Sequence, residues 1–129
     1  MAIDRAGEQG PQNLGAVPHL TLNMTETLVM GPTRFSAQGQ FISRGNIDNT
    51  FNTSLATSIN NNSIGSVVYL NLYAGYELND HFEFSASIHN ALDRAPPLSP
   101  YPNLPDPQYN GQFYDLIGRA FKIAVMYRM

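Results

Sequence analysis

The chain has 129 residues, no cysteine and no tryptophan, with 13% charged residues and a formal net charge of −3, which suits one domain or part of one. Lys122 is its single lysine, so a phosphate backbone would find few partners and nucleic-acid binding is not expected. The lack of cysteine excludes disulfides and thiolate metal sites.

The polar residues are mostly Asn, Ser, Thr and Gln, and strong helix-forming runs are absent, which predicts an all-β chain. Residues 1–18 are rich in Gly, Pro and Gln without a period, and we expect an irregular leading segment there. Over 19–30 apolar and polar residues alternate as the two faces of a strand, and Glu26 is the one polar residue on the apolar side. Gly31-Pro32 interrupts this pattern, which resumes over 33–44 and predicts a tight hairpin.

The clearest alternation runs over residues 66–78, after a stretch from 45 to 66 of mostly Asn, Ser, Thr, Asp and Gly that we expect to be a long solvated loop. Asn79-Asp80-His81 is a short turn sequence that leads into an alternating strand over 82–90. This turn length predicts the register of the two strands. If Leu78 pairs with Phe82, then Tyr76 faces Phe84 and Leu72 faces Ile88.

Residues 91–117 hold most of the prolines and predict a second long loop, before a last alternating strand over 118–129. The predicted fold is therefore an antiparallel meander of about five long strands, which forms one segment over 19–129. The predicted strands cover residues 19–30, 33–44, 66–78, 82–90 and 118–129.

Very short and very long connections alternate along this meander, as in transmembrane barrels, which have tight periplasmic turns and long outer loops. Strands of roughly 9 to 13 residues suit a tilted crossing of a hydrocarbon core. One face is apolar and the other is polar, so we expect the first to meet lipid and the second to face a watery lumen. The predicted lipid-facing residues are Leu70, Leu72, Tyr76, Phe82, Phe84, Ile88, Phe121, Ile123, Val125 and Tyr127.

Aromatic side chains gather where lipid meets water. With the tight turns on the periplasmic side, Phe35, Tyr76, Phe82 and Tyr127 all fall on the outward face near that side. Four strands then share one aromatic girdle, which favours an open segment of a transmembrane β-barrel.

Two further motifs stand at residues 90–97 and 114–121. Asn90-Ala91-Leu92-Asp93-Arg94-Ala95-Pro96-Pro97 resembles the Asn-Leu-Phe-Asp-Lys-x-Pro-Pro motif that follows the penultimate strand of TonB-dependent outer-membrane receptors. Tyr114-Asp115-Leu116-Ile117-Gly118-Arg119-Ala120-Phe121 resembles the Tyr-Asp-x-x-Gly-Arg-x-Phe entry to their final strand, and residues 68–79 resemble the strand before both motifs. The family generally ends in an aromatic residue, whereas Met129 stands here.

The resemblance implies the last five strands of a 22-stranded barrel with an N-terminal plug, which imports iron chelates, cobalamin, sugars or similar solutes with energy from TonB. It also implies a location in the outer membrane of a Gram-negative bacterium. The expected partners are membrane lipid, the rest of the barrel and plug, the barrel-assembly machinery through the C-terminal strand, and TonB through the missing N-terminal part. Five strands cannot close a barrel, so we expect a C-terminal fragment without independent transport.

No catalytic, cofactor or metal residues are predicted, and an enzyme is not expected. The histidines His19, His81 and His89 stand on separate elements without carboxylates at ligand spacing, and Asp93 and Asp115 suit turns beside Pro and Gly. The aromatic residues of the second long loop are candidates for contact with an extracellular ligand, because rings present rigid contact area. They are Tyr101, Tyr109, Phe113 and Tyr114.

Two other classes of protein fit parts of the pattern. A soluble β-sandwich that binds carbohydrate would use the apolar face as its core and Tyr69 and Tyr73 as a sugar platform, but it needs a second apolar sheet. A small outer-membrane protein could instead close its barrel by oligomerising, which requires export.

Overall fold

The computed structural model describes residues 4–10, 17–49, 62–98 and 109–129, and it divides the chain into two compact units. The sheet unit consists of Leu22–Gln40, Val68–Arg94 and Ile117–Met129. The loop unit consists of Met1–Thr21, Phe41–Val67 and Ala95–Leu116.

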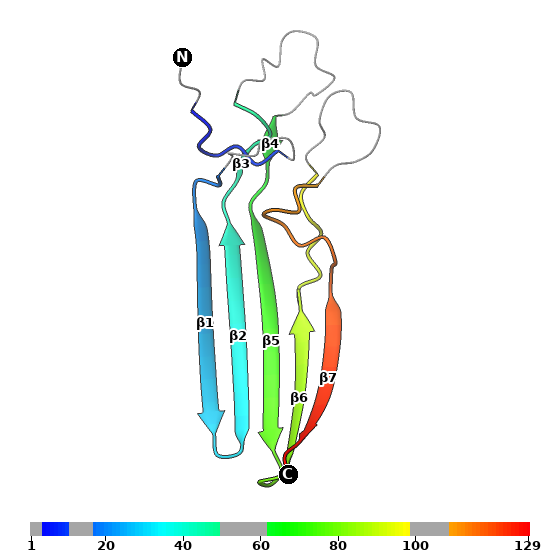
Figure 1. Ribbon diagram of the computed structural model, residues 1–129. Helices are drawn as coiled ribbons and strands as arrows, with labels where there is room; N and C mark the ends of the chain where they lie inside the picture. The colour runs from blue at the N-terminus through cyan, green and yellow to red at the C-terminus, as the bar shows by residue number, and fades with distance from the viewer. Residues whose placement is uncertain (1–3, 11–16, 50–61, 99–108) are drawn as a thin grey trace. The chain divides into compact units, whose positions relative to one another are not determined.

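The five long strands form one sheet in the order β1-β2-β5-β6-β7, and their directions alternate (Figure 1). The predicted all-β class and the antiparallel sheet of five strands are confirmed. Each strand ends one or two residues inside the predicted range at one or both ends. The strands are β1 (Thr21–Met30), β2 (Thr33–Ile42), β5 (Val67–Glu77), β6 (Phe82–His89) and β7 (Ala120–Tyr127).

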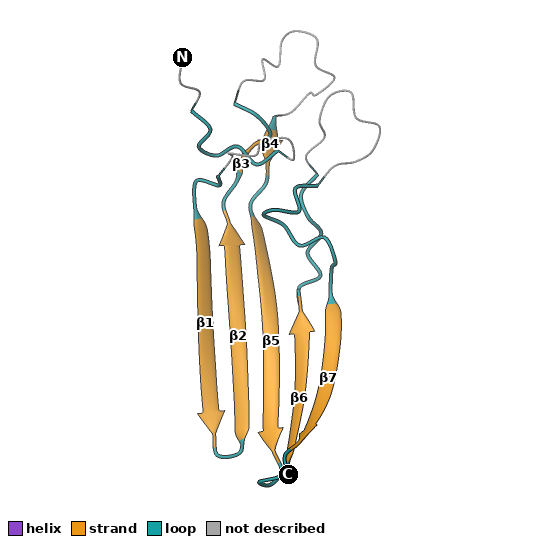
Figure 2. Cartoon of the chain, viewed as in Figure 1, coloured by secondary structure: helices purple, strands orange, loops and turns teal. Residues whose placement is uncertain are grey.

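Within the described residues the secondary structure is strand, turn and loop (Figure 2). No helix in this part of the chain is long and apolar enough to cross a membrane.

The register of β5 and β6 agrees with the turn argument. The amide of Leu78 donates to the carbonyl of Phe82 at 3.0 Å, and the pairs Tyr76–Phe84 and Leu72–Ile88 lie opposite each other as predicted. The side-chain oxygen of Asn79 accepts the amides of both His81 and Phe82 at 2.9 Å, which closes the turn. The Asn79 side chain thus accepts the free backbone amides of the turn and helps to fix the register between β5 and β6.

The loop unit has its own small core. β3 (Gly45–Asn46) pairs with β4 (Ser63–Ile64) as an antiparallel ribbon. Ile42, Ile47 and Ile64 are each 1% exposed. The prediction that residues 45 to 66 form a long solvated loop is therefore wrong at the described positions, because Ile47 and Ile64 are buried there although their neighbours in sequence are polar.

Residues 4–10, hereafter the N-terminal strap, are bound to the rest of the loop unit by backbone hydrogen bonds. The amide of Asn46 donates to the carbonyl of Gly7 at 2.8 Å, and the amide of Gln9 returns to the carbonyl of Asn46 at 2.7 Å. The backbones approach so closely that a Cβ at Gly45 would lie 2.3 Å from the Gly7 oxygen. The sequence predicts only an irregular segment here, whereas the structure attaches it to β3 through these bonds.

Candidate functional site

The apolar side chains of the sheet unit are largely exposed. On β7, Phe121 is 70% and Ile123 is 83% exposed. Leu70 and Ile88 are half-buried, and the other eight predicted lipid-facing residues are exposed. The sheet therefore presents a broad apolar surface, far beyond the isolated apolar residues that are normal on a soluble protein.

The aromatic residues of this face meet at the turn end of the sheet. Phe82 lies opposite Tyr127 in the register of β6 and β7, and their ring centroids are 5.1 Å apart. Tyr76 lies opposite Phe84 on β5 and β6. The ring contact of Phe82 with Tyr127 and the cross-strand pair of Tyr76 and Phe84 thus place aromatic residues of neighbouring strands near the short turn.

Glu26 lies on the apolar side of β1, as the alternation predicts. Its side chain lines an apolar groove of about 540 Å³ together with residues such as Leu28, Phe35, Ala74 and Ala86. The groove exists because β2, β5 and β6 each place an alanine there between larger apolar neighbours.

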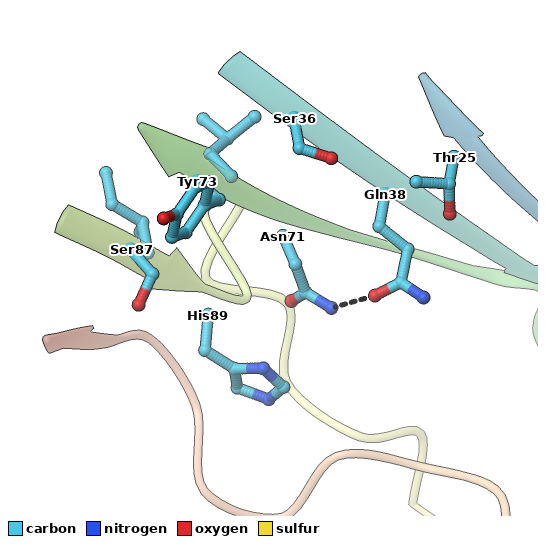
Figure 3. A pocket seen from close by; sticks show the side chains of 9 residues that line it. Thr25, Ser36, Gln38, Asn71, Tyr73, Ser87 and His89 are labelled. Carbon is cyan, nitrogen blue, oxygen red and sulfur yellow. Dashed lines mark hydrogen bonds between the residues drawn. The ribbon is translucent and has the colours of Figure 1, made fainter. Parts of the chain in front are cut away.

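A second groove, of about 360 Å³, lies on the polar face of the sheet unit, and we call it the polar groove. Figure 3 shows side chains from β1, β2, β5 and β6 that converge on it. Its lining is Thr25, Ser36, Gln38, Asn71, Leu72, Tyr73, Ser87, Ile88 and His89.

Asn71 is held in place at the centre of the polar groove by two hydrogen bonds. Its Nδ2 donates to Oε1 of Gln38 at 3.2 Å (Figure 3), and its Oδ1 accepts the amide of Asn90 at 3.0 Å. Beside it, Tyr73 extends along the strand over Gly75, where a Cβ would lie 2.8 Å from the phenol oxygen. The groove thus has amide and aromatic groups whose positions are set by the strands themselves.

The two motifs that suggested the receptor family meet in the sheet unit. Asn90 is fully buried with φ +49°, and its side chain both accepts from the amide of Arg94 and donates to its carbonyl, each at 2.9 Å. Asp93, with φ +51°, accepts the amide of Arg119 at 3.2 Å and lies 3.5 Å from its guanidinium. The expectation that Asp93 serves a turn is confirmed, and its carboxylate also joins that turn to the start of β7.

The aromatic candidates of the second long loop differ in their placement. Tyr109 is exposed, whereas Tyr114 is 4% exposed and donates its hydroxyl to Oε1 of Gln9 at 2.5 Å. Phe113 is half-buried against Tyr114, with the rings edge to face at 6.4 Å. Tyr101 lies outside the described residues. Of these three described residues, Tyr109 alone is exposed. Tyr114 is hydrogen-bonded to the N-terminal strap, and Phe113 packs against Tyr114.

The strap is the feature that sequence analysis missed. Gln9 is fully buried, and besides Tyr114 it contacts Ser43, whose carbonyl accepts its Nε2 at 2.9 Å. The side-chain Nδ2 of Asn110 donates to the backbone carbonyls of Gln9 at 3.0 Å and Gly10 at 3.1 Å. A buried glutamine in a Gly- and Pro-rich segment carries no periodic signal, so pattern analysis cannot find these contacts.

Metal ligands are not gathered in the described part of the chain, where no three His, Cys, Asp or Glu side chains come together. His81 lies beside Arg128, whose carbonyl is 3.0 Å from its Nδ1. His19 approaches Gly7 in the loop unit, and His89 lines the polar groove of the sheet unit.

The comparisons with known proteins add no relative. No family model matches the chain, and no curated protein or solved structure is significantly similar to it.

Proposed function

We propose that the chain forms part of the wall of an outer-membrane β-barrel, and that this barrel is a TonB-dependent receptor of which these strands are the last five. The observation that carries the proposal is the exposure of the apolar face, with Phe121, Ile123 and Val125 uncovered on β7. In water such a face would associate or be covered, whereas in a bilayer acyl chains cover it.

The connections between the strands support this placement. The hairpin turn at Gly31-Pro32 and the turn at Asn79 are short, and the β2–β5 and β6–β7 connections are long. Because neighbouring strands are antiparallel, both short turns fall at one end of the sheet and both long connections start at the other (Figure 1). Outer-membrane barrels sort their connections in this way.

The strand lengths fit a membrane only in part. β1 and β2 have 10 residues each and β5 has 11, which match the 9–11 or so of a tilted crossing. β6 and β7 have eight residues each. These two strands are also the ones bounded by the Asn90 turn and its contact with Arg119.

A barrel wall needs more strands than the five described. β1 and β7 lie at the two edges of the sheet, and lipid offers no hydrogen bonds to their outer N–H and C=O groups. In the proposed receptor the rest of the barrel pairs with both edges, the plug occupies the lumen, and TonB acts on the plug side. These five strands then contribute surface and lumen wall, and transport belongs to the whole assembly.

Nitroxide accessibility along β7 tests the proposal. The chain has no cysteine, so each substitution at positions 121 to 127 supplies one labelling site. After refolding into phosphatidylcholine vesicles, where the open edges can pair with neighbouring copies, we expect oxygen to reach labels at 121, 123, 125 and 127. A polar nickel chelate should instead reach labels at 122, 124 and 126, because successive side chains point to opposite faces.

Three outcomes separate the candidate functions. Equal access of both reagents along β7, or a water-soluble chain that does not enter vesicles, would contradict a membrane wall and favour the soluble sandwich. Alternation together with one cross-linked species of fixed copy number would favour the small oligomeric barrel. Alternation with variable association supports the receptor segment, whose edges require strands from elsewhere.

A further inference from the structure

Glu26 is the exception on the apolar face of the sheet unit. Among the described residues of the five long strands, it is the only Asp, Glu, Lys, Arg or His that the alternation assigns to this face. Its side chain is exposed, and no described residue pairs with its carboxylate. A charge on an otherwise apolar face is costly wherever water is excluded, so it needs an opposite charge there.

The hairpin of β1 and β2 leaves Glu26 uncovered. The turn at Gly31-Pro32 has two residues, so Glu26 on β1 stands opposite Ala37 on β2. The hydroxyls of the adjacent pair, Thr27 and Ser36, lie 3.0 Å apart, as this register requires. Because Ala37 has only a methyl group, the space beside the Glu26 side chain is continuous with the apolar groove that both residues line.

The apolar groove beside Glu26, hereafter the Glu26 groove, is large enough for a small molecule. Its volume of about 540 Å³ lies within the range of small-molecule sites, roughly 300–1,000 Å³. Ala74 and Ala86 lie opposite each other in its lining, and their small side chains leave space between larger apolar residues such as Leu28 and Ile88. The lining also includes three residues whose side chains the alternation directs to the other face, namely Thr27, Ser36 and Tyr73.

We propose that the Glu26 groove binds an organic ammonium ion with an apolar body. The ammonium lies against the Glu26 carboxylate, and the hydrocarbon body occupies the space beside Ala74 and Ala86. The ring of Phe35, which also lines the groove, can offer its π face to the cation. The inference goes beyond the proposed function, because in that barrel this groove would open to the bilayer and not to the lumen.

Other occupants fit the Glu26 groove less well. A neutral acyl chain fills the apolar space but leaves the carboxylate without an opposite charge. An anion is repelled by the carboxylate, and a metal ion needs several oxygen ligands, whereas Glu26 is the one carboxylate among the described lining residues. Arg34 is next to Phe35 in sequence, but it lines a separate groove together with Glu77 and Glu83. No described basic residue lines the Glu26 groove, so the carboxylate is open to a cation from outside the chain.

Three ligands that share one adamantane cage separate the effect of charge from that of shape. They are adamantylammonium, adamantanol and adamantane carboxylate. Each is titrated by calorimetry at neutral pH into the refolded chain in octaethylene glycol monododecyl ether, an uncharged detergent, and partition into protein-free micelles is measured in parallel and subtracted. Adamantylammonium should bind with Kd below about 1 mM, and at least about fivefold more tightly than the alcohol or the carboxylate.

Three variants separate the Glu26 carboxylate from the apolar space beside it. Glu26→Gln removes the charge at the same size, so the ammonium should bind within about twofold of the alcohol. Glu77→Gln is the matched control, because Glu77 is an exposed carboxylate on β5 outside the groove, and the preference for the ammonium should remain. Ala86→Leu fills the groove and should weaken the ammonium and the alcohol alike, by about tenfold. Circular dichroism confirms that each variant keeps its strands.

Any of three results would overturn the inference. The first is no binding of adamantylammonium beyond its partition into micelles. The second is equal affinity for the ammonium and the alcohol, which is expected of a groove that holds only acyl chains. The third is an equal effect of Glu26→Gln and Glu77→Gln. Alternating nitroxide access without a preference for the ammonium removes only this site, and that preference without alternation removes only the membrane wall.

Discussion

Replacement of Ile123 by lysine tests whether water or lipid acyl chains cover the apolar face. Ile123 lies in the middle of β7, opposite Ala86, and is 83% exposed. If water covers this side chain, Ile123→Lys changes the free energy of unfolding by no more than about 0.5 kcal/mol, as is usual for exposed positions. If acyl chains cover it, a lysine near the bilayer midplane costs about 2–4 kcal/mol.

The matched control is Ala124→Lys, one residue further along the same strand. Ala124 lies opposite Ser85 on the other face of the sheet, where a lysine can reach an aqueous lumen. Unfolding in urea is followed by circular dichroism after refolding of each variant into phosphatidylcholine vesicles. Equal stability of the two variants and the parent chain would refute a lipid-covered face, because only Ile123→Lys places a charge among acyl chains.

Two further predictions, each with a matched control substitution, concern contacts inside the two units. Gly45→Ala places a Cβ 2.3 Å from the Gly7 oxygen, so it should release the N-terminal strap and cost about 2 kcal/mol, seen as faster hydrogen exchange at Gly7 and Asn46. Gly65→Ala, with nothing within 4 Å, should leave this exchange unchanged, and equal effects would contradict the close approach. Asn90→Ala should cost about 2–4 kcal/mol in thermal unfolding, because it removes both bonds to Arg94 and strains a positive φ. Asn90→Gly should recover about 1 kcal/mol of this, and a glycine variant no more stable than the alanine variant would contradict the backbone part of the argument.

The long strands could be predicted from sequence because each one has an apolar and a polar face. Leu72 and Ile88 illustrate this, since the period of two assigns both to one face and the three-residue turn at Asn79 then sets them opposite each other. The same reasoning placed Glu26 on the apolar side. Strands and their register can therefore be predicted where the alternation of apolar residues and the length of the turn lead to the same pairing.

The remaining features depend on contacts between distant segments. The role of Tyr114 could not be foreseen, because its hydroxyl contacts Gln9, 105 residues earlier in the chain. The burial of Ile47 and Ile64 could not be predicted either, since each is a single apolar residue among polar neighbours and forms no periodic pattern. The polar groove could not be predicted from sequence, because its lining comes from four strands and depends on their register.

The attachment of the strap has a consequence for the order in which the chain folds. Asn110 reaches Gln9 across 101 positions, and Tyr114 does so across 105. Contacts of such high sequence separation form slowly, because a large loop must be closed before any bond is gained. The hairpins β1–β2 and β5–β6 close over short turns and can form on the microsecond scale of isolated hairpins. We therefore expect the strap to gain its contacts with Asn110 and Tyr114 after these two hairpins have closed, and the loop unit to complete its structure after them.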